Sequence, residues 1–332
     1  MVQRRLLELF VCPRCGARFD PGEPDERAHA TGPDGDVGPV VCARGHRFPA
    51  DGGYVDFSPD TERDATTART FESFGYEWNT FDDVRDEDAQ FARVYFRDLD
   101  MESLGGKTGL DAGCGKGRYT RFLAPHLEAL IALDGSSAVK AAARNLAPFA
   151  NVVVVKADLR AVPVVAGSLD VIVCLGVLHH LEDPRRGFAS LVRLLGPDGR
   201  ILVYLYSRPS GFGARRLALS AAAALRRLTV RTPHGVLRIL SAPVAAVLYV
   251  GVVQVGAFGQ RAGMARLAGL PMASYRGKPL RSLVLDTFDR LSAPVEHRYV
   301  WADLAPWFEE EGLVVDAARD EAGWFVLAHR AP

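Results

Sequence analysis

One stretch constrains the fold more than any other: an apolar run that breaks into three closely spaced glycines and then resumes as a helix. It reads Gly109-Leu110-Asp111-Ala112-Gly113-Cys114-Gly115-Lys116-Gly117. Glycines let the backbone turn sharply and approach a ligand closely, and the helix that follows presents unpaired N–H groups. The stretch therefore predicts a strand, a ligand-binding turn and a helix, in that order.

A second predicted strand, residues 129–134, ends in an acid. Asp134 lies about twenty residues beyond the glycine turn, where a carboxylate can bind both hydroxyls of a ribose. The two features together favour a ligand that contains a ribose.

The rest of the chain continues the alternation of strand and helix. We expect an α/β fold with a mostly parallel sheet, closed by an antiparallel hairpin at residues 312–316 and 324–328 after a helix at 301–311. The expected parallel strands are 108–112, 129–134, 152–156, 167–174 and 199–206, and the expected helices between the first of them are 118–125 and 137–146.

The segment from Leu110 to Gly117 resembles the first motif of the class I S-adenosylmethionine (SAM) methyltransferases, hydrophobic-Asp-hydrophobic-Gly-Cys-Gly-x-Gly. The Gly-x-Gly-x-x-Gly spacing of dinucleotide dehydrogenases fits less well. The resemblance runs from about Thr108 to Tyr206. It implies a Rossmann-like sheet of seven strands and SAM as cofactor.

The resemblance also implies roles for single residues. Asp111 and the three glycines would shape the methionine and ribose side of the SAM pocket, Asp134 would bind the ribose hydroxyls, and Asp158 would accept a hydrogen bond from the adenine amino group. The alternative for Asp158 is an acid that caps a loop or helix. The cofactor-binding candidates are Asp111, Gly113, Gly115, Gly117, Asp134, Asp158, Leu159 and Leu175.

Residues 175–184 resemble the segment after the fourth strand of small-molecule methyltransferases. Because ligands bind at the carboxyl ends of parallel strands, these side chains should face the reaction site. His180 is the candidate general base, with Tyr204, Tyr206 and His297 also on the substrate side. The alternative is that one of the two adjacent histidines bonds a backbone carbonyl while the other packs, since positioning alone can contribute heavily to methyl transfer.

Four metal ligands stand near the start of the chain. Cys12 and Cys15 form a Cys-x-x-Cys pair, and Cys42 and His46 form a Cys-x-x-x-His pair. Such pairs predict a tetrahedral Zn²⁺ site. With Tyr54-Val55-Asp56-Phe57 they look like the small zinc domain of large-subunit ribosomal RNA guanine methyltransferases. Residues 1–60 hold seven basic and ten acidic residues, a poor surface for phosphates, so we expect a structural zinc.

Two amphipathic helices are expected between residues 64 and 104, joined near residues 80–83. The segment Phe74-Gly75-Tyr76-Glu77-Trp78 resembles one that covers the cofactor in related methyltransferases. Plain packing of the aromatic rings on the sheet is the alternative.

Residues 208–285 carry twelve Lys or Arg and no Asp or Glu, although the whole chain balances 40 basic against 40 acidic residues. Within them, Ile239 to Gln260 is uncharged for 22 residues, long enough to cross a bilayer. Pro243, Gln254 and three glycines disfavour a spanning helix, and we expect a lid of apolar helices. A buried subdomain or homodimer interface, a pocket for an apolar or anionic substrate, and peripheral membrane contact stay open.

These parts predict a SAM-dependent methyltransferase that acts on an O, N or C atom of a small or medium-sized metabolite, of the kind made in bacterial specialised metabolism. The alternatives are an RNA base methyltransferase, for which the charge balance argues poorly, and a SAM-binding scaffold. Met1 to Phe10 is too short for a secretory signal, so we expect a cytoplasmic protein. The predicted parts are 1–60 (zinc module), 61–106 (cover), 107–207 (SAM core), 208–285 (insertion) and 286–332 (end of the core).

Overall fold

The computed structural model describes residues 6–19, 39–58, 64–209, 214–270, 272–321 and 323–331. The chain divides into two compact units. Unit 1 comprises Met1–Arg208 and Val295–Pro332, and unit 2 comprises Pro209–Pro294. Each is described by itself.

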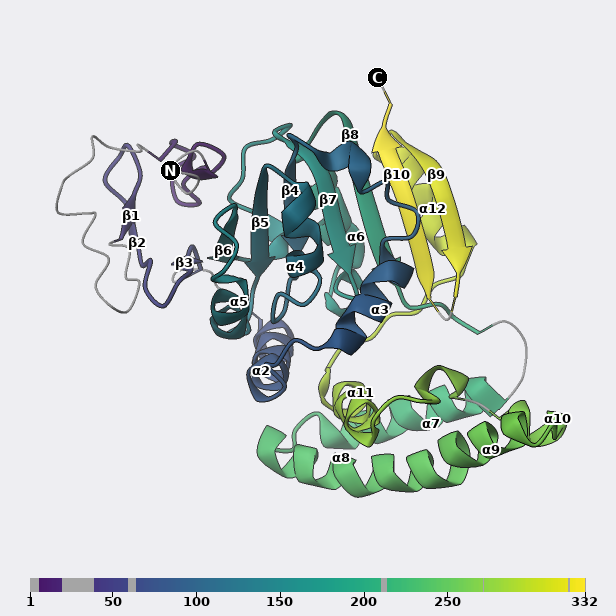
Figure 1. Cartoon of the computed structure of the whole chain (residues 1–332). Helices are drawn as coiled ribbons and strands as arrows, with labels where there is room; N and C mark the ends of the chain where they lie inside the picture. Colours follow the sequence, from purple (N-terminus) through teal and green to yellow (C-terminus); the bar gives the residue numbers. More distant parts are fainter. Residues whose placement is uncertain are drawn as a thin grey trace. The chain divides into compact units, whose positions relative to one another are not determined.

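Unit 1 is built on a mixed sheet of eight strands in the order β3-β6-β5-β4-β7-β8-β10-β9 (Figure 1). Neighbouring strands are parallel except that β10 is antiparallel to both β8 and β9. The bounds are β3 (Val55–Asp56), β4 (Thr108–Ala112), β5 (Ala129–Asp134), β6 (Val152–Lys156), β7 (Leu169–Leu175), β8 (Leu195–Leu205), β9 (Leu313–Asp320) and β10 (Trp324–Arg330). This confirms the predicted Rossmann-like fold with its antiparallel end.

Apolar side chains are buried on both faces of the sheet, as its parallel centre requires. One face packs against α3, α4 and α5, and the other packs against α6 and α12. The helices of unit 1 are α2 (Ala65–Thr80), α3 (Asp86–Tyr95), α4 (Thr120–Leu123), α5 (Val139–Leu146), α6 (Pro184–Val192) and α12 (Trp301–Glu310), with short 3₁₀ turns η1 (Glu102–Leu104), η2 (Ala124–His126), η3 (Leu159–Ala161) and η4 (Leu178–His180).

The eighth strand, β3, corrects the expected count of seven. It pairs in parallel with β6, with Val55 opposite Val155, and the Phe57 N–H donates to the Lys156 carbonyl at 2.9 Å. The Lys156 ammonium also lies 2.9 Å from Asp56. A two-residue strand carries too little alternation to be recognised in a sequence, and only its partner strand reveals it.

The N-terminal segment packs onto this edge of the core. Its short strands are β1 (Val40–Val41) and β2 (Arg47–Phe48). Phe10, Phe19, Phe48 and Phe57 form one cluster of rings with centroids 5.1 to 5.7 Å apart. Phe10 also forms a β-bridge to Val164 of the core. The predicted boundary between residues 60 and 61 lies outside the described residues.

The order of the strands reverses between β4 and β7. The chain runs from β4 outward through β5 and β6, and then returns to β7 and β8 on the other side of β4. Ligands of open α/β sheets bind outside the carboxyl ends of the strands at such a switch point. The glycine turn after β4 and the segment after β7 therefore meet there.

Unit 2 is entirely helical in its described residues. It consists of α7 (Ala214–Thr229), α8 (His234–Leu248), a π-helical segment η5 (Tyr249–Gln254), α9 (Val255–Arg261), α10 (Ala265–Ala268), the 3₁₀ turn η6 (Ala273–Tyr275) and α11 (Leu280–Ser292). From α8 to α9 the helix is continuous over His234–Arg261. The unit ends at Pro294 rather than at the predicted 285, because α11 packs against α8 and α7.

The described residues contain one helix long and apolar enough to cross a membrane, His234–Arg261, and only 22% of its most apolar window is buried. One side of the helix nevertheless contributes Ala245 and Val253 to a small apolar core with Leu283.

Candidate functional site at the switch point

The glycine turn has a backbone that other residues rarely adopt. Gly113, Gly115 and Gly117 have φ angles of 85°, 54° and 79°. A Cβ on Gly113 would lie 2.3 Å from a methyl group of Val177, and one on Gly115 would lie 3.1 Å from the indole nitrogen of Trp78. Glycine is therefore required both by the turn and by close packing against neighbouring segments.

Asp134 lies against this turn. Its Oδ2 accepts a hydrogen bond from the Gly115 N–H at 3.0 Å, while its Oδ1 accepts from the backbone and hydroxyl of Ser136 at 2.8 and 2.6 Å. The structure thus brings together two of the predicted cofactor residues from β4 and β5. Binding of a ribose by Asp134 stays a prediction.

Asp111 is buried beneath the turn. Its Oδ2 accepts from the Thr120 hydroxyl at 2.6 Å. Burial raises the pKa of this carboxyl to about 7, with a smaller contribution from the charge of Asp134. Asp111 thus joins the strand before the turn to the helix after it, and its predicted contact with the cofactor stays a prediction.

Asp158 is held by a neighbour that the sequence analysis did not consider. Its carboxylate accepts from the Arg160 N–H at 2.8 Å and is held at two points by the Arg160 guanidinium, at 3.0 and 2.8 Å. It also caps η3, as the alternative interpretation had it. Leu159 and Leu175 are both buried. The cofactor roles of all three stay predictions.

The two predicted helices before the core are present, and α2 reaches the glycine turn. Lys116, inside the turn, donates to the carbonyls of Phe81 and Asp83 at 3.0 and 2.6 Å, just beyond the end of α2. Its ammonium also lies 5.6 Å from the Trp78 ring centroid. Burial lowers the pKa of Lys116. Sequence reasoning missed this lysine because it treated only the glycines of the turn as functional.

The second predicted site, at the ends of β7 and β8, is a cluster of rings. His179 stacks on Tyr206 with centroids 3.9 Å apart, and His180 lies 4.3 Å from His179 and 4.8 Å from Phe74 of α2. His180 Nδ1 lies 2.8 Å from the Val295 carbonyl oxygen. That contact requires a proton on Nδ1, so in the neutral ring Nε2 carries the lone pair. One histidine thus bonds a backbone carbonyl while the other packs on a ring, as the alternative interpretation had it. The role of His180 as a general base stays a prediction.

His179 and His297 belong to the same cluster. The His297 N–H donates to the His179 carbonyl at 2.9 Å. His297 Nε2 and both ring nitrogens of His179 are buried and have no hydrogen-bond partner among the described residues. Burial, with the nearby charges, lowers the pKa of His179 well below 6.5, so its ring is neutral. Buried polar atoms without partners are uncommon and mark a place where a ligand can supply the missing bonds.

The cluster also contains an ion pair between Arg298 and Glu296, a pairing that the sequence did not reveal. The Arg298 guanidinium donates to Glu296 at 2.7 and 2.8 Å and lies 4.8 Å from the Tyr206 ring centroid. Tyr204 lies 6.0 Å from Tyr206 by ring centroids, and it packs on Phe325 at 4.5 Å and on Tyr95 at 5.0 Å. The predicted grouping of Tyr206, His180 and His297 is therefore found, and Tyr204 also belongs to an aromatic core.

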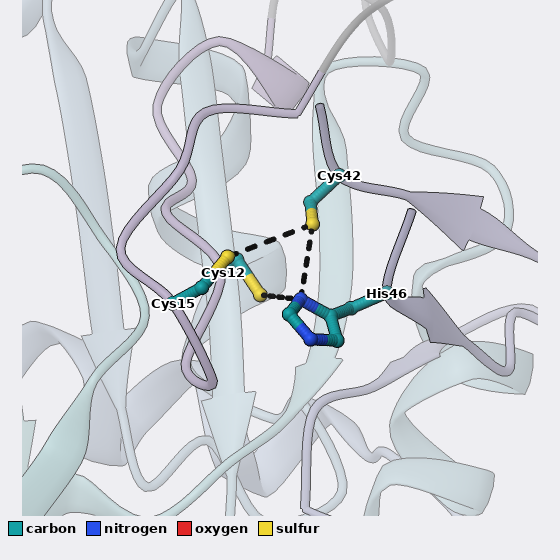
Figure 2. Close-up of side chains that lie close together, drawn as sticks. All are labelled: Cys12, Cys15, Cys42 and His46. Carbon is teal, nitrogen blue, oxygen red and sulfur yellow. Dashed lines mark hydrogen bonds between the residues drawn. The ribbon is translucent and has the colours of Figure 1, made fainter. Parts of the chain in front are cut away.

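The four predicted metal ligands converge (Figure 2). Their ligand atoms all lie within 4.8 Å of one another, and the contacts are Cys15 Sγ to Cys42 Sγ at 3.8 Å and His46 Nδ1 to the sulfurs of Cys42 and Cys12 at 3.5 and 3.6 Å. Donors around a tetrahedral zinc, bonded at about 2.0 to 2.3 Å, lie about 3.5 to 3.8 Å apart. The spacing therefore fits such a metal.

Each ligand pair is formed by a tight turn. Gly16 follows the first pair with φ of 69°, and Gly45 lies inside the second with φ of 82°. Burial acts to raise the pKa of the Cys42 thiol, but N–H groups of Arg44 and His46 and the neighbouring side chains outweigh it and lower this pKa to about 6. The cysteines are free thiols with no disulfide among them, as metal ligands must be.

Comparison with known proteins identifies the part of the chain that holds the switch-point site. Residues 110–203 match the methyltransferase domain family. The match starts in β4, before the glycine turn, and ends in β8, so it includes Asp134, Asp158 and His180.

Similar proteins share this domain. An uncharacterized protein of Synechococcus is 39% identical over 111 residues, which are 31% of this chain and 26% of that protein. A ubiquinone biosynthesis O-methyltransferase of Coxiella burnetii is 30% identical over 108 residues, 32% of this chain and 46% of that protein. A SAM-dependent methyltransferase structure from Aquifex aeolicus has a TM-score of 0.45 at 14% identity, and the alignment covers 77% of this chain and 98% of that one. The chain thus spans a quarter to a half of these curated relatives.

Proposed function

We propose that this protein is an enzyme that transfers the methyl group of SAM to a small-molecule acceptor. One observation carries the proposal: a single turn of α2 connects the two halves of the site. Trp78 lies against Gly115 of the glycine turn, and Phe74, four residues earlier, lies 4.8 Å from His180. Four residues of helix span about 6 Å, so the cofactor side and the histidine cluster are close neighbours.

The chain's residues fit SAM at the glycine turn. Gly113 and Gly115 leave room where a Cβ would collide with Val177 or Trp78, and Asp134 presents its carboxylate beside them. These residues, with Asp158 at the end of β6, would hold the cofactor. When bound, SAM supplies an electrophilic methyl group on its sulfonium.

The histidine cluster would then position the acceptor and take up its proton. His180 is fixed through Nδ1, and Nε2 makes no hydrogen bond in the described part of the chain, so its lone pair is available to an acidic acceptor hydrogen. Neutral His179 and the Arg298–Glu296 pair surround Tyr206 without adding net charge. This setting suits an uncharged acceptor with an oxygen or nitrogen to be methylated.

We propose further that Cys12, Cys15, Cys42 and His46 hold a structural Zn²⁺. The proposal rests on their tetrahedral spacing and on their place at the sheet edge, remote in sequence from the methyltransferase domain. All four protein ligands are supplied, which leaves no open position for substrate.

Calorimetric titration of SAM and of its demethylated product tests the proposal. We expect micromolar binding by the purified full chain and loss of at least tenfold in affinity in Asp134→Ala, because the variant lacks the carboxylate beside Gly115. Asp316→Ala, which removes a surface acid paired with His329, is the matched control and should bind normally. Absence of binding by the unaltered chain would overturn the proposal.

An acceptor screen with radiolabelled SAM follows. Turnover on a small aromatic or polar acceptor, lost in His180→Asn with SAM affinity retained, is the expected result. Tight SAM binding without turnover on any acceptor would instead identify a SAM-binding scaffold.

A further inference from the structure

The long helix of unit 2 is apolar on two opposite faces. Its inner face buries Leu237, Ser241, Ala245 and Val253, and the first three of these are spaced four residues apart. Its outer face exposes large apolar side chains at spacings of three and four residues along most of its length. They are Val236, Ile239, Leu240, Val244, Val247, Val250 and Phe258, with Val247 73% and Ile239 69% exposed.

Large apolar side chains are exposed on α7 as well. Leu225 and Leu228 at the end of α7 are 46% and 76% exposed. A soluble chain rarely exposes so many large apolar side chains in one contiguous region, and such a region marks an interaction surface. We call the exposed apolar residues of α7, α8, η5 and α9 the outer face.

Basic side chains accompany the outer face. Arg227, Arg231, Arg238, Arg261 and Arg266 are all exposed, at or near the ends of these helices. From residue 208 to 285 there is no acidic residue. The acids of unit 2 are confined to α11, where Asp286 accepts a hydrogen bond from the Tyr275 hydroxyl. The segment from α7 to α10 thus carries exposed apolar side chains together with exposed arginines, and no acid lies among them.

The helix that packs against α8 argues against a membrane-spanning α8. The inner face of α8 packs against α11, which carries Asp286, Asp289 and Arg290. A spanning α8 would draw these charged groups into the hydrocarbon, which is costly. A helix with one face packed on its own protein and one apolar face with flanking arginines instead lies in the plane of the interface.

A second copy of the chain is also a poor partner. Face-to-face pairing would set the arginines of one outer face against those of the other, and like charges in an interface are unfavourable. An anionic bilayer offers both an apolar interior for the side chains and negative headgroups for the arginines. We propose that the outer face docks the protein on the surface of an anionic phospholipid bilayer. This proposal stands independently of the methyltransferase activity.

Sedimentation of the full chain with vesicles tests the proposal. We expect binding to vesicles of phosphatidylglycerol and phosphatidylcholine at 50 mM salt, weak binding to phosphatidylcholine alone, and loss of most binding at 500 mM salt, since salt screens surface charge. Failure to bind the anionic vesicles at low salt would overturn the proposal.

Two pairs of variants separate the apolar from the charged contribution. The double variant Ile239→Asp, Val247→Asp should bind the anionic vesicles at least tenfold more weakly. Val314→Asp, which makes the same apolar-to-acid change at an exposed valine of β9, should bind them normally. Arg231→Glu with Arg238→Glu should reduce it by at least about fivefold for each charge removed. Arg93→Glu on α3 is the control for charge. Circular dichroism of each variant establishes that it is folded.

Depth of insertion distinguishes a bilayer from a second copy. In Phe258→Trp, the new indole should shift its emission to the blue and be quenched by brominated lipid acyl chains. Light scattering should give a monomer before vesicles are added. A dimer that Ile239→Asp and Val247→Asp dissociate, together with no quenching, would assign the outer face to self-association and overturn the proposal.

Discussion

His179 illustrates how single residues in this protein carry unusual environments. It is fully buried, stacked on Tyr206, and neither ring nitrogen has a hydrogen-bond partner. Burial is therefore the main reason why its pKa lies well below 6.5. Because this ring stays neutral in the folded protein, the free energy of unfolding should depend on pH, and this can be measured without knowing the substrate.

We predict that His179→Phe changes the pH dependence of stability. Below pH 6.5 the unfolded chain gains a proton on His179 that the native ring does not accept, so native stability falls as the pH is lowered. The slope from this one group is about 1.4 kcal/mol per pH unit. Urea unfolding at pH 7, 6 and 5 should show the variant gaining stability relative to the unaltered chain as the pH falls. The exposed His126, changed to Phe, is the control, and parallel curves for His179→Phe would contradict the prediction.

We predict that Gly113→Ala is destabilising by at least about 2 kcal/mol and reduces SAM binding, because φ is 85° and the new Cβ would lie 2.3 Å from Val177. Val177→Ala should relieve the collision but not the backbone strain. Thermal unfolding and calorimetry of the double variant should therefore recover only part of the loss. Full recovery of stability and SAM binding in the double variant would mean that the collision with Val177, and not backbone strain, causes the whole effect of Gly113→Ala.

For single residues, the sequence predicted which side chains lie near one another at the site. It did not predict the hydrogen-bond and ion-pair partners of each side chain. The proximity of Asp134 to the glycine turn followed from the order of the strands. The pairing of Asp158 with Arg160 did not, because a neighbouring arginine can equally point to solvent. The Arg298–Glu296 pair depends on where the chain returns after unit 2, which no local pattern determines.

Among the elements, α2 is held in place by the turn that it covers. Lys116 bonds the carbonyls of Phe81 and Asp83, and Asn145 of α5 donates to the carbonyls of Asp82 and Lys116 at 2.8 and 2.9 Å. The end of α2 is thus fixed to the glycine turn through backbone groups rather than through apolar packing alone.

We predict that Lys116→Met loosens α2 and weakens SAM binding several-fold. Methionine keeps the length of the side chain and loses the donors to two carbonyls, each contributing on the order of 1 kcal/mol or more because the group is charged. Hydrogen exchange measured by mass spectrometry should rise over residues 65–83. Lys140→Met, at an exposed position on α5, should leave exchange unchanged, and equal exchange in both variants would contradict this role.

Helices and strands were predicted well where the hydrophobic periodicity extends over many residues. They were predicted poorly where contacts with other parts of the chain determine the element or its place in the fold. The alternation of strands and helices from 108 to 206 and the final hairpin were recognised from sequence. The two-residue β3 was not, and neither was the membership of α11 in unit 2. For α8 the sequence is apolar all round, so only the structure reveals that α11 covers one face and leaves the other exposed.

For the whole molecule, the Cys/His cluster and the eight-stranded sheet belong to one folded unit. Phe10 and Phe57 share a core with residues of β6, β7 and β8, and β3 completes the sheet edge. The front segment was expected to be a separate module. Its stability should instead be coupled to that of the sheet.

We therefore predict that Cys12→Ala, or removal of zinc by a chelator, lowers the melting temperature of unit 1 as one transition. The bound metal contributes folding free energy directly, because no preformed site exists in the unfolded chain. Calorimetry should show the same decrease for the chelated protein and for Cys12→Ala, with no further effect of chelator on the variant. Elemental analysis should find one zinc per chain, and purified protein without metal would contradict the site.

The path of the chain between β8 and α12 has a final consequence. Ser207 forms a β-bridge with Tyr299, and the Arg208 N–H donates to the Tyr299 carbonyl at 2.8 Å, so the segments that enter and leave unit 2 lie side by side in unit 1. For the sheet, unit 2 is equivalent to one long loop between two fixed neighbours. An insertion of this kind can become longer or shorter, or be replaced, over evolution without a change in the order of the strands. The switch-point residues of unit 1 and the surface residues of unit 2 can therefore change independently of each other over evolution.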